Sequence, residues 1–418
     1  MLTELFTSAL GLQSPWQVAK VRFTHEQGRI DFDLEIVSKR LTCPACQAPE
    51  QPIHDRLDRS WRHLNFFQYQ AYLHAPVPRI QCAACGKTTQ LVVPWANPKS
   101  GFSLLFEALA ICLAQHMPMA QVAALLGVNA NPLWERFTRT IIAAHDQENF
   151  SDVRAINVDE TASKRGHRYV TVVADNDARR VIFATAGKDA QTLADFASAL
   201  QDHGGNAAQI SAISMDFSAA FIKGARDSFP NAKVCFDQFH IVSMANKAVD
   251  EVRRSEVSSE PILRKQRFSV LKDKSALTVK QAAFMDTFVH SHLKTARAWR
   301  MKEALRDIVR ERLPAQATQT KLESLLNWLR RSQLAPMIAL AKTIHKHLDG
   351  IVRAIADQRS NGFAESLNSQ IQAARARAKG YKTTENFICM IYLLAAKLKH
   401  LPVCPWRANN ARAAKGAM

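Results

Sequence analysis

The sequence predicts an α/β domain that is interrupted by an all-α insertion and preceded by a zinc-binding, strand-rich module and a helix-turn-helix. Two CxxC pairs flank a strand-rich stretch near the N-terminus. Between residues 153 and 236 the spacing of apolar residues changes repeatedly between a period of two, typical of strands, and a period near 3.6, typical of helices. From 241 to 358 the period is helical almost throughout.

The composition is that of a globular protein with several cores. The chain has 418 residues, of which 47% are hydrophobic, with 14 Gly and 16 Pro, which excludes disordered and fibrous classes. Its formal net charge is +18. Residues 1–240 hold 23 basic and 23 acidic residues, whereas residues 241–418 hold 32 and 14. This asymmetry favours a polyanionic partner for the C-terminal part, and a generally basic protein without such a partner is the alternative.

No segment of the sequence is expected to direct the chain to a membrane. The first 16 residues lack a basic leader ahead of an apolar core and lack a small-residue cleavage site. The most apolar stretches, Leu104–Ala114 and Phe387–Ala396, are shorter than the roughly 18–20 residues of a membrane span. We therefore expect a cytoplasmic protein whose eight cysteines do not form a disulfide framework.

Four of the cysteines have the spacing of a structural zinc site. Residues 16–41 alternate apolar and polar positions, which predicts a strand hairpin that turns near Gly28 and leads into the first cysteine pair. The two pairs are Cys43 with Cys46 and Cys82 with Cys85. Four thiolates close a tetrahedral site, so we expect one architectural Zn²⁺. His54 and His63, which lie between the pairs, could each replace one thiolate.

The next segment has the pattern of a helix-turn-helix. Helices are predicted over residues 102–116, 119–126 and 132–145, with Gly127 at the turn between the last two. The last helix could present polar side chains to a DNA groove, namely Asn131, Glu135, Arg136 and Arg139. An ordinary helical hairpin is the alternative.

A mixed α/β order follows, and then a helical segment. Strands are predicted over residues 153–158, 168–174, 180–186, 210–215 and 232–236, with helices over 190–203 and 218–229. Residues 241–358 are basic, helical in period and interrupted by Pro261, Pro314 and Pro336. A final helix is expected from Asn361 to Lys379, with Gly380 as its C-terminal stop.

Three acidic residues are expected at one edge of the α/β sheet. Asp159 and Asp216 are predicted to end the first and fourth strands, at the edge where open α/β sheets place their sites. Glu365 lies one turn inside the final helix. Three neighbouring carboxylates repel one another unless cations neutralise them, and Mg²⁺ or Mn²⁺ suits oxygen ligands. Two such ions can promote phosphodiester displacement, although each acid taken singly is more simply a helix cap or a surface carboxylate.

Several short motifs carry a resemblance to a known family. They are "VDE" at 158–160, "MDFSAAF" at 215–221, "DQFH" at 237–240 and "SNGFAESLNSQIQ" followed by "RAKGY", together with the CxxC pairs and the helix-turn-helix. Over essentially its full length the chain resembles bacterial insertion-sequence transposases of the DDE, ribonuclease H-like superfamily, specifically the ISL-three family. The resemblance implies a ribonuclease H-like catalytic domain with a helical insertion before the glutamate. It also implies that Asp159, Asp216 and Glu365 form a catalytic triad holding two Mg²⁺ or Mn²⁺ ions.

The resemblance extends to residues around the triad. Asp237 and His240 match a D-x-x-H element of related transposases. Asp237 either orients a ligand of the scissile phosphate or caps the following helix, and His240 either contacts DNA or is structural. Asn361 and Asn368 lie about one helical turn from Glu365 and are expected to orient its carboxylate.

A basic surface is expected to extend from the triad. Its residues are Arg375, Arg377, Lys379 and Lys382, for which ordinary solvated charges are the alternative. The chain departs from the family pattern at Ser366, where the family has Gly, and at Gln372, where it has Lys. Gln372 in place of Lys is expected to weaken a contact to a DNA phosphate, and the assignment to the family is unchanged.

The expected function is a transposase that binds the terminal inverted repeats of an insertion sequence, cleaves at the element ends and joins them to target DNA. The partner is double-stranded DNA, with a homo-oligomer in the DNA complex and a location at the bacterial nucleoid. A catalytically silent DNA-binding regulator and a ribonuclease H-like nuclease without strand transfer are the alternatives. The expected domains are a zinc module (1–98), a helix-turn-helix (99–150), the first part of the catalytic core (151–240), the insertion (241–358) and the C-terminal helix with a basic tail (359–418).

Overall fold

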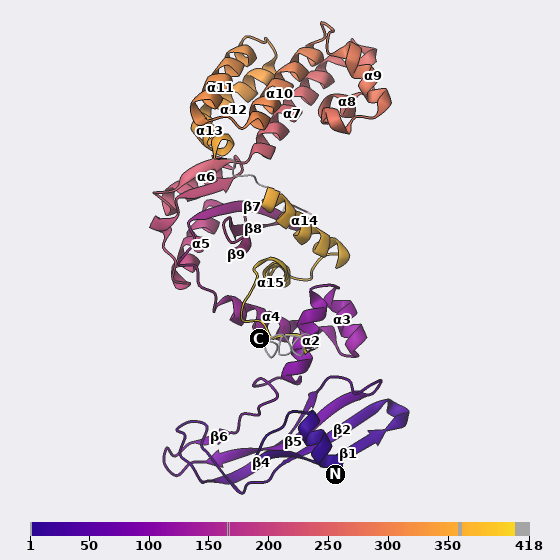
Figure 1. The fold of residues 1–418 in the computed structure, drawn as a ribbon, viewed down its shortest axis with the longest axis vertical. Coiled ribbons are helices and arrows are strands. Elements are labelled where there is room, and N and C mark those ends of the chain that lie inside the picture. Colours follow the sequence, from indigo (N-terminus) through magenta and orange to yellow (C-terminus); the bar gives the residue numbers. More distant parts are fainter. Residues whose placement is uncertain (1, 165, 167, 358–361, 406–418) are drawn as a thin grey trace, which may run out of the picture. The chain divides into compact units, whose positions relative to one another are not determined.

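The computed structural model describes residues 2–164, 166, 168–357 and 362–405. The chain forms two compact units, residues 1–144 with 399–418, and residues 145–398. Figure 1 labels most of their helices and strands. No helix within the described residues is both long enough and apolar enough to cross a membrane.

The first unit consists of a strand-rich module followed by helices. Its elements are α1 (Leu2–Ala9), β1 (Trp16–Thr24), β2 (Arg29–Ile36), β3 (Arg40–Leu41), β4 (Gln51–Arg62), β5 (Gln70–Gln81), β6 (Thr88–Gln90), α2 (Leu104–Ala114), α3 (Met119–Leu126) and α4 (Ala130–His145). The strands pair in the order β1-β2-β5-β4-β3, and β6 pairs with β5. The predicted hairpin is confirmed, since β1 and β2 pair antiparallel on either side of Gly28, whose φ is +58°.

The turn between α3 and α4 depends on Gly127. Its φ of +65° is a conformation that a Cβ disfavours, and its N–H donates to the carbonyls of Ala123 and Ala124. A Cβ at this position would also lie 2.5 Å from the side-chain nitrogen of Gln70 in β5. The buried Arg62 of β4 donates to the carbonyl of Leu126 at 3.3 Å, so the end of α3 is attached to the strand module.

The second unit begins with the α/β region and continues through a long helical segment. Its elements are β7 (Ala155–Lys164), β8 (Arg168–Asp175), β9 (Arg180–Ala186), α5 (Ala190–Asp202), β10 (Ala212–Met215), α6 (Ala219–Ser228), β11 (Lys233–Phe236), α7 (Gln238–Glu256), α8 (Arg267–Leu271), α9 (Val279–Phe288), α10 (Lys294–Glu311), α11 (Ala315–Arg330), α12 (Ala335–Lys346), α13 (Leu348–Ala356), α14 (Gly362–Arg377) and α15 (Thr384–Ala395). The order agrees with the predicted one.

The sheet of this unit is mixed. Its order is β11-β10-β7-β8-β9, with β11, β10 and β7 parallel and β7, β8 and β9 antiparallel. Ile156 and Val158 of β7 pack in one core with Phe196 of α5. Because successive side chains of a strand point to opposite faces, Asp159 projects from the other face, where α14 packs on β7.

Two features of the second unit differ from the prediction. The strand β7 does not end at Asp159, because its hairpin with β8 continues to Lys164. The segment after α14 is not only a basic tail, because α15 packs on β9 and is mostly buried. The hydroxyl of Tyr392 accepts a hydrogen bond from the backbone N–H of Ala184 at 3.0 Å, which attaches α15 to the edge of the sheet.

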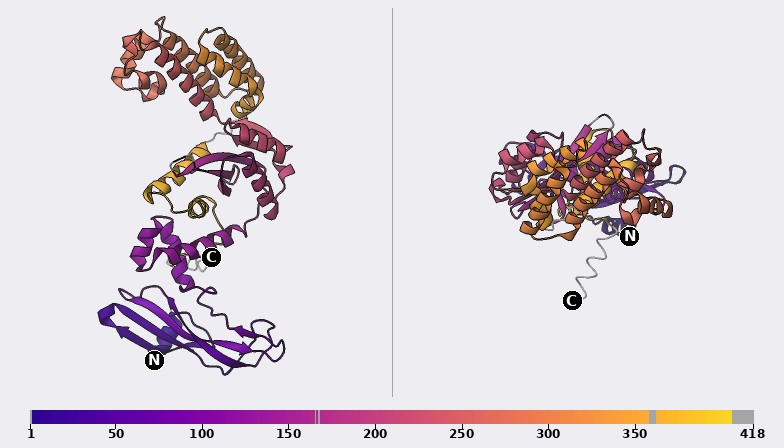
Figure 2. Two further views of the ribbon diagram at one scale, coloured as in Figure 1. Left: turned by 180° about the vertical axis from the view of Figure 1, so that it is seen from behind. Right: turned by 90° about the horizontal axis from the view of Figure 1, so that it is seen from above.

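The helices α7 to α13 gather into one bundle, which Figure 2 shows from behind and from above. Their buried side chains form one core that also includes Phe236 of β11. The helix α7 begins at Gln238, capped by Asp237, so the predicted boundary after residue 240 falls inside a helix.

Removing the carboxylate of Glu256 is expected to destabilise this bundle. Glu256 is buried at the end of α7 and accepts hydrogen bonds from the backbone N–H groups of Lys294 and Thr295, each at 2.7 Å. The Thr295 hydroxyl also donates to Glu256 at 2.7 Å, so Glu256→Ala leaves three donors of the first turn of α10 without their acceptor, at a cost of about 1–3 kcal/mol. Thermal unfolding should show a Tm lower by several degrees, while Glu323→Ala, on the exposed face of α11, should leave it unchanged.

Candidate functional site

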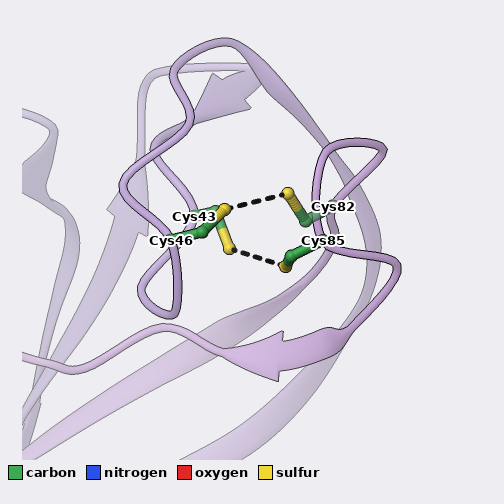
Figure 3. Close-up of side chains that lie close together, drawn as sticks. All are labelled: Cys43, Cys46, Cys82 and Cys85. Atoms are coloured by element: carbon green, nitrogen blue, oxygen red, sulfur yellow. Dashed lines mark hydrogen bonds between the residues drawn. The ribbon is translucent and has the colours of Figure 1, made fainter.

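The four predicted zinc ligands come together in the first unit. The Sγ atoms of Cys43, Cys46, Cys82 and Cys85 all lie within 4.8 Å of one another, at the ends of loops that flank β4 and β5 (Figure 3). The Cys43–Cys85 and Cys46–Cys82 Sγ distances are 3.9 and 3.5 Å. Zn–S bonds of about 2.3 Å in a tetrahedron require sulfur atoms about 3.8 Å apart, so the cluster fits Zn²⁺. The backbone N–H of Cys85 lowers the pKa of the Cys82 thiol to about 7, which favours the thiolate.

Neither His54 nor His63 joins this cluster. His54 lies beside the Asp55 carboxylate, with its Nδ1 3.3 Å away, and the Nδ1 of His63 is 2.8 Å from the Ser103 hydroxyl. Burial lowers the pKa of His63 to about 4. The alternative in which a histidine replaces one thiolate is therefore wrong.

Strand register places three carboxylates side by side at one edge of the second unit's sheet. Ser214 of β10 pairs with Asn157 of β7, and Met215 pairs with Phe236 of β11. If both pairings are extended to Asp216, which follows the last residue of β10, Asp216 lies opposite Asp159 on one side and opposite Asp237 on the other. From the sequence we expected Asp159 at the end of a strand. The strand β7 in fact continues, but its pairing with β10 stops at Asn157, so no β10 residue pairs with β7 beyond that point and the side of β7 at Asp159 is open.

The charges at this edge interact. Burial is the main cause that raises the pKa of Asp159 to about 6, and the carboxylates of Asp237 and Asp216 add to the rise. The N–H of Glu160 and the charge of His240 act in the opposite direction. Burial also raises the pKa of Glu160. Burial and neighbouring carboxylates therefore both disfavour the ionised form of Asp159.

The helix α14 supplies polar partners to β7. The Asn368 side chain donates to the Asp159 carboxylate at 2.9 Å. Gln372 donates to the Thr161 hydroxyl, and Arg375 donates to the carbonyl of Ser163 at 3.0 Å. On β7 the contacted residues are every second one, and on α14 the donors are spaced by about one helical turn, so one face of α14 runs along one face of β7. Asn368 was expected to orient Glu365, and the structure places it on Asp159 instead.

Glu365 lies exposed in the first turn of α14. Among the described residues, the ligand atoms of Asp159, Asp216 and Glu365 do not form a group within 4.8 Å. Asn361, also predicted near the site, lies outside the described residues.

Asp237 and Asp216 each accept a backbone hydrogen bond at the start of a helix. The Asp237 carboxylate caps α7 by accepting the N–H of Phe239 at 2.8 Å, and it lies 3.8 Å from Nε2 of His240. Asp216 similarly accepts the N–H of Ser218 at 2.9 Å ahead of α6. Each acid thus holds the turn that leads from its strand into a helix and keeps an oxygen for other partners.

A basic cleft lies between the end of β7 at Ser163 and Lys164 and the end of α14. Its volume is roughly 760 Å³, and its cationic lining residues are Lys164, Arg375, Lys379 and Lys382. Three of them were predicted from the sequence. Lys164 was not, because the predicted strand ended at residue 158 and β7 continues to Lys164. The fourth predicted cation of this surface, Arg377, is exposed.

The polar residues of α4 divide into two kinds. Asn131 and Arg139 are exposed, and Arg139 pairs with Glu135 one turn earlier at 2.8 Å. Arg136 is half-buried and donates to the backbone carbonyls of Pro98 and Lys99. Arg136 therefore attaches α4 to the loop between β6 and α2.

Three family models match the chain in the order of its modules. The zinc-finger model of the transposases of IS204, IS1001, IS1096 and IS1165 matches residues 39–85, which include all four clustered cysteines. The helix-turn-helix model of transposase family ISL3 matches residues 92–141, so the helical hairpin alternative is wrong. The transposase model of the same family matches residues 156–391, from β7 into α15.

Curated relatives match along most of the chain. The transposase for insertion sequence element IS1557 from Mycobacterium tuberculosis is 27% identical over 381 residues, covering 84% of each chain. The transposase for element IS1001 from Bordetella parapertussis is 24% identical over 408 residues, covering 94% of this chain and 98% of the relative. With a zinc ribbon, a helix-turn-helix and a matching catalytic domain in one order, the chain belongs to the ISL3 family of insertion-sequence transposases.

Proposed function

We propose that this transposase binds the terminal inverted repeats of its element, cleaves at the element ends and joins the released 3′-hydroxyl to target DNA. The observation that carries the proposal is the row of carboxylates at the open edge of the sheet, within the region matched by the transposase model. The mixed sheet and the helical segment between β11 and α14 support a ribonuclease H-like core with an all-α insertion.

The acidic edge fits divalent cations. Asp159, Asp216 and Glu365 offer the oxygen ligands that Mg²⁺ and Mn²⁺ prefer. The raised pKa of Asp159 reflects burial and neighbouring carboxylates, a combination that a bound cation would offset. When bound, a pair of such ions supplies activation of a water or 3′-hydroxyl and stabilisation of the leaving oxygen.

The chain's own residues position these carboxylates. Asn368 and the N–H of Glu160 each donate to Asp159, at 2.9 and 2.8 Å, and fix its orientation on the strand. Asp216 is fixed by the turn into α6. Glu365 and Asn368 lie three residues apart on α14 and are therefore neighbours on the helix surface. The hydrogen bond between Asn368 and Asp159 thus also fixes the position of Glu365 relative to Asp159.

We assign base reading to the N-terminal unit and phosphate binding to the C-terminal part. Exposed side chains on the second helix of a helix-turn-helix reach base edges, as Asn131 and Arg139 would. Cations around the cleft beside α14 suit backbone phosphates, which the charge of residues 241–418 also favours. A homo-oligomer in the DNA complex is part of this proposal, since two element ends are processed together.

Two pairs of substitutions test the division. Asn131→Ala with Arg139→Ala should weaken binding to end DNA by about 1–3 kcal/mol and change binding to scrambled DNA little. Lys379→Ala with Lys382→Ala should weaken both equally and reduce the slope of log affinity against log salt by about 2. Fluorescence anisotropy of labelled duplexes at several salt concentrations measures both. If the lysine pair removed the preference for end DNA instead, the division would be wrong.

A further inference from the structure

A second metal-ligating cluster lies in the second unit, away from the acidic edge. His145 ends α4, Asp146 follows it, and His203 follows α5. The ligand atoms that these three residues offer all lie within 4.8 Å of one another. The cluster shares no residue with the four cysteines.

Both imidazoles are held in the way that metal-ligating histidines are held. Nε2 of His145 donates to the carbonyl of Ile182 at 2.9 Å, and Nδ1 of His203 donates to the carbonyl of Glu148 at 2.8 Å. Each bond fixes the tautomer, which leaves a lone pair on Nδ1 of His145 and on Nε2 of His203. A hydrogen bond from the opposite ring nitrogen to a carbonyl is the usual support of a ligating histidine.

The surroundings make the two rings rigid. His145 stacks on Tyr392 with ring centroids 4.1 Å apart, and His203 stacks on Phe150 at 4.5 Å. The two imidazoles are 5.0 Å apart and inclined by 68°. Stacking uses the ring faces, so it leaves the remaining in-plane nitrogen lone pairs for other partners.

We propose that His145, Asp146 and His203 bind a Zn²⁺ ion through two nitrogens and one oxygen, with solvent as the fourth ligand. Ligands of tetrahedral zinc lie about 3.4 Å apart, and the three ligand atoms here all lie within 4.8 Å of one another. The exposed Asp146 carboxylate can rotate toward the two imidazoles. The bound ion connects the segment that leads from α4 into β7 with the end of α5.

Substitutions that keep the supporting hydrogen bonds test the site. His203→Asn retains a donor for the Glu148 carbonyl, and His145→Gln retains one for the Ile182 carbonyl, yet each removes the proposed ligand atom. Asp146→Asn removes the charge at an exposed position. His290→Gln, at an exposed histidine before α10, is the matched control.

The measurement is calorimetric titration of the full chain with zinc chloride, in millimolar Mg²⁺, starting from protein that retains the zinc of its four cysteines. We expect one further equivalent to bind and to raise the Tm by several degrees. Each of the three variants should weaken that binding at least tenfold, whereas His290→Gln should not. The proposal is overturned if no further equivalent binds, or if His203→Asn and Asp146→Asn bind it as wild type does. The zinc affinities of His203→Asn and Asp146→Asn test the site even if His145→Gln fails to fold.

Discussion

Asp159→Asn is expected to reduce DNA cleavage and strand transfer by at least about a thousandfold while DNA binding persists. The substitution keeps the shape of the side chain and one of the two oxygens that accept from Asn368 and the N–H of Glu160, but it removes the charge needed to place a cation. Asp227→Asn, at an exposed carboxylate on α6, is the control and should retain full activity.

The same substitution should raise stability when Mg²⁺ is removed. The pKa of Asp159 in the folded chain is about 6, above the range of an unfolded aspartate, so its ionised form disfavours folding. Wild type therefore loses stability as pH rises through the interval up to about 6, and Asp159→Asn does not. In EDTA at pH 8 the variant should unfold about 2–5 °C higher than wild type, and the difference should vanish near pH 4. Loss of activity together with a lowered Tm at pH 8 would indicate a folding defect instead.

Cys82→Ser is expected to release the zinc and to abolish recognition of end DNA. Four thiolates within 4.8 Å form a closed site, and the binding free energy of such a site is also folding free energy of its module. End DNA should bind at least about 100-fold more weakly, because β4 and β5 connect the zinc loops to Arg62, which attaches α3.

Metal analysis after dialysis against a weak chelator, together with anisotropy on end DNA, measures both effects. Cys112→Ser, in α2 and outside the cluster, should retain the zinc and the affinity. Retention of about one zinc per chain by Cys82→Ser, with unchanged binding to end DNA, would contradict the structural role of the cluster.

The order of strands and helices from β7 to β11, and the helices of the helix-turn-helix, could be predicted from the sequence, because the period of the apolar residues and the turn residues agree locally. The turn at Gly127 and the hairpin at Gly28 each need a positive φ, and glycine marks both. The zinc site could be predicted because ligand identity and spacing are enough to specify a closed tetrahedron. Its histidine alternative could not be rejected until the contacts of His63 were known.

What could not be predicted depends on pairing between distant segments. Asp159 was placed at a strand end because its local sequence does not show that β8 continues to pair with β7 up to Lys164. The alignment of Asp237 with Asp216 depends on the register of β10 and β11, which no local pattern encodes. The bond from Asn368 to Asp159 joins residues 209 positions apart and follows from the packing of α14 on the sheet.

The proposal that the acidic edge cuts the element ends is tested most directly by mapping nicks on a duplex that carries the element end and its flank. Purified wild-type protein should nick at the junction in Mg²⁺ and not in EDTA, and should join the new 3′-hydroxyl to a target duplex. Nicking without joining would indicate a nuclease. Asp159→Asn, Asp216→Asn and Glu365→Gln should each bind the duplex and leave it intact. Metal-dependent nicking at the junction that persisted in all three variants would contradict the account and would move the search to Glu160, Asp237 and His240.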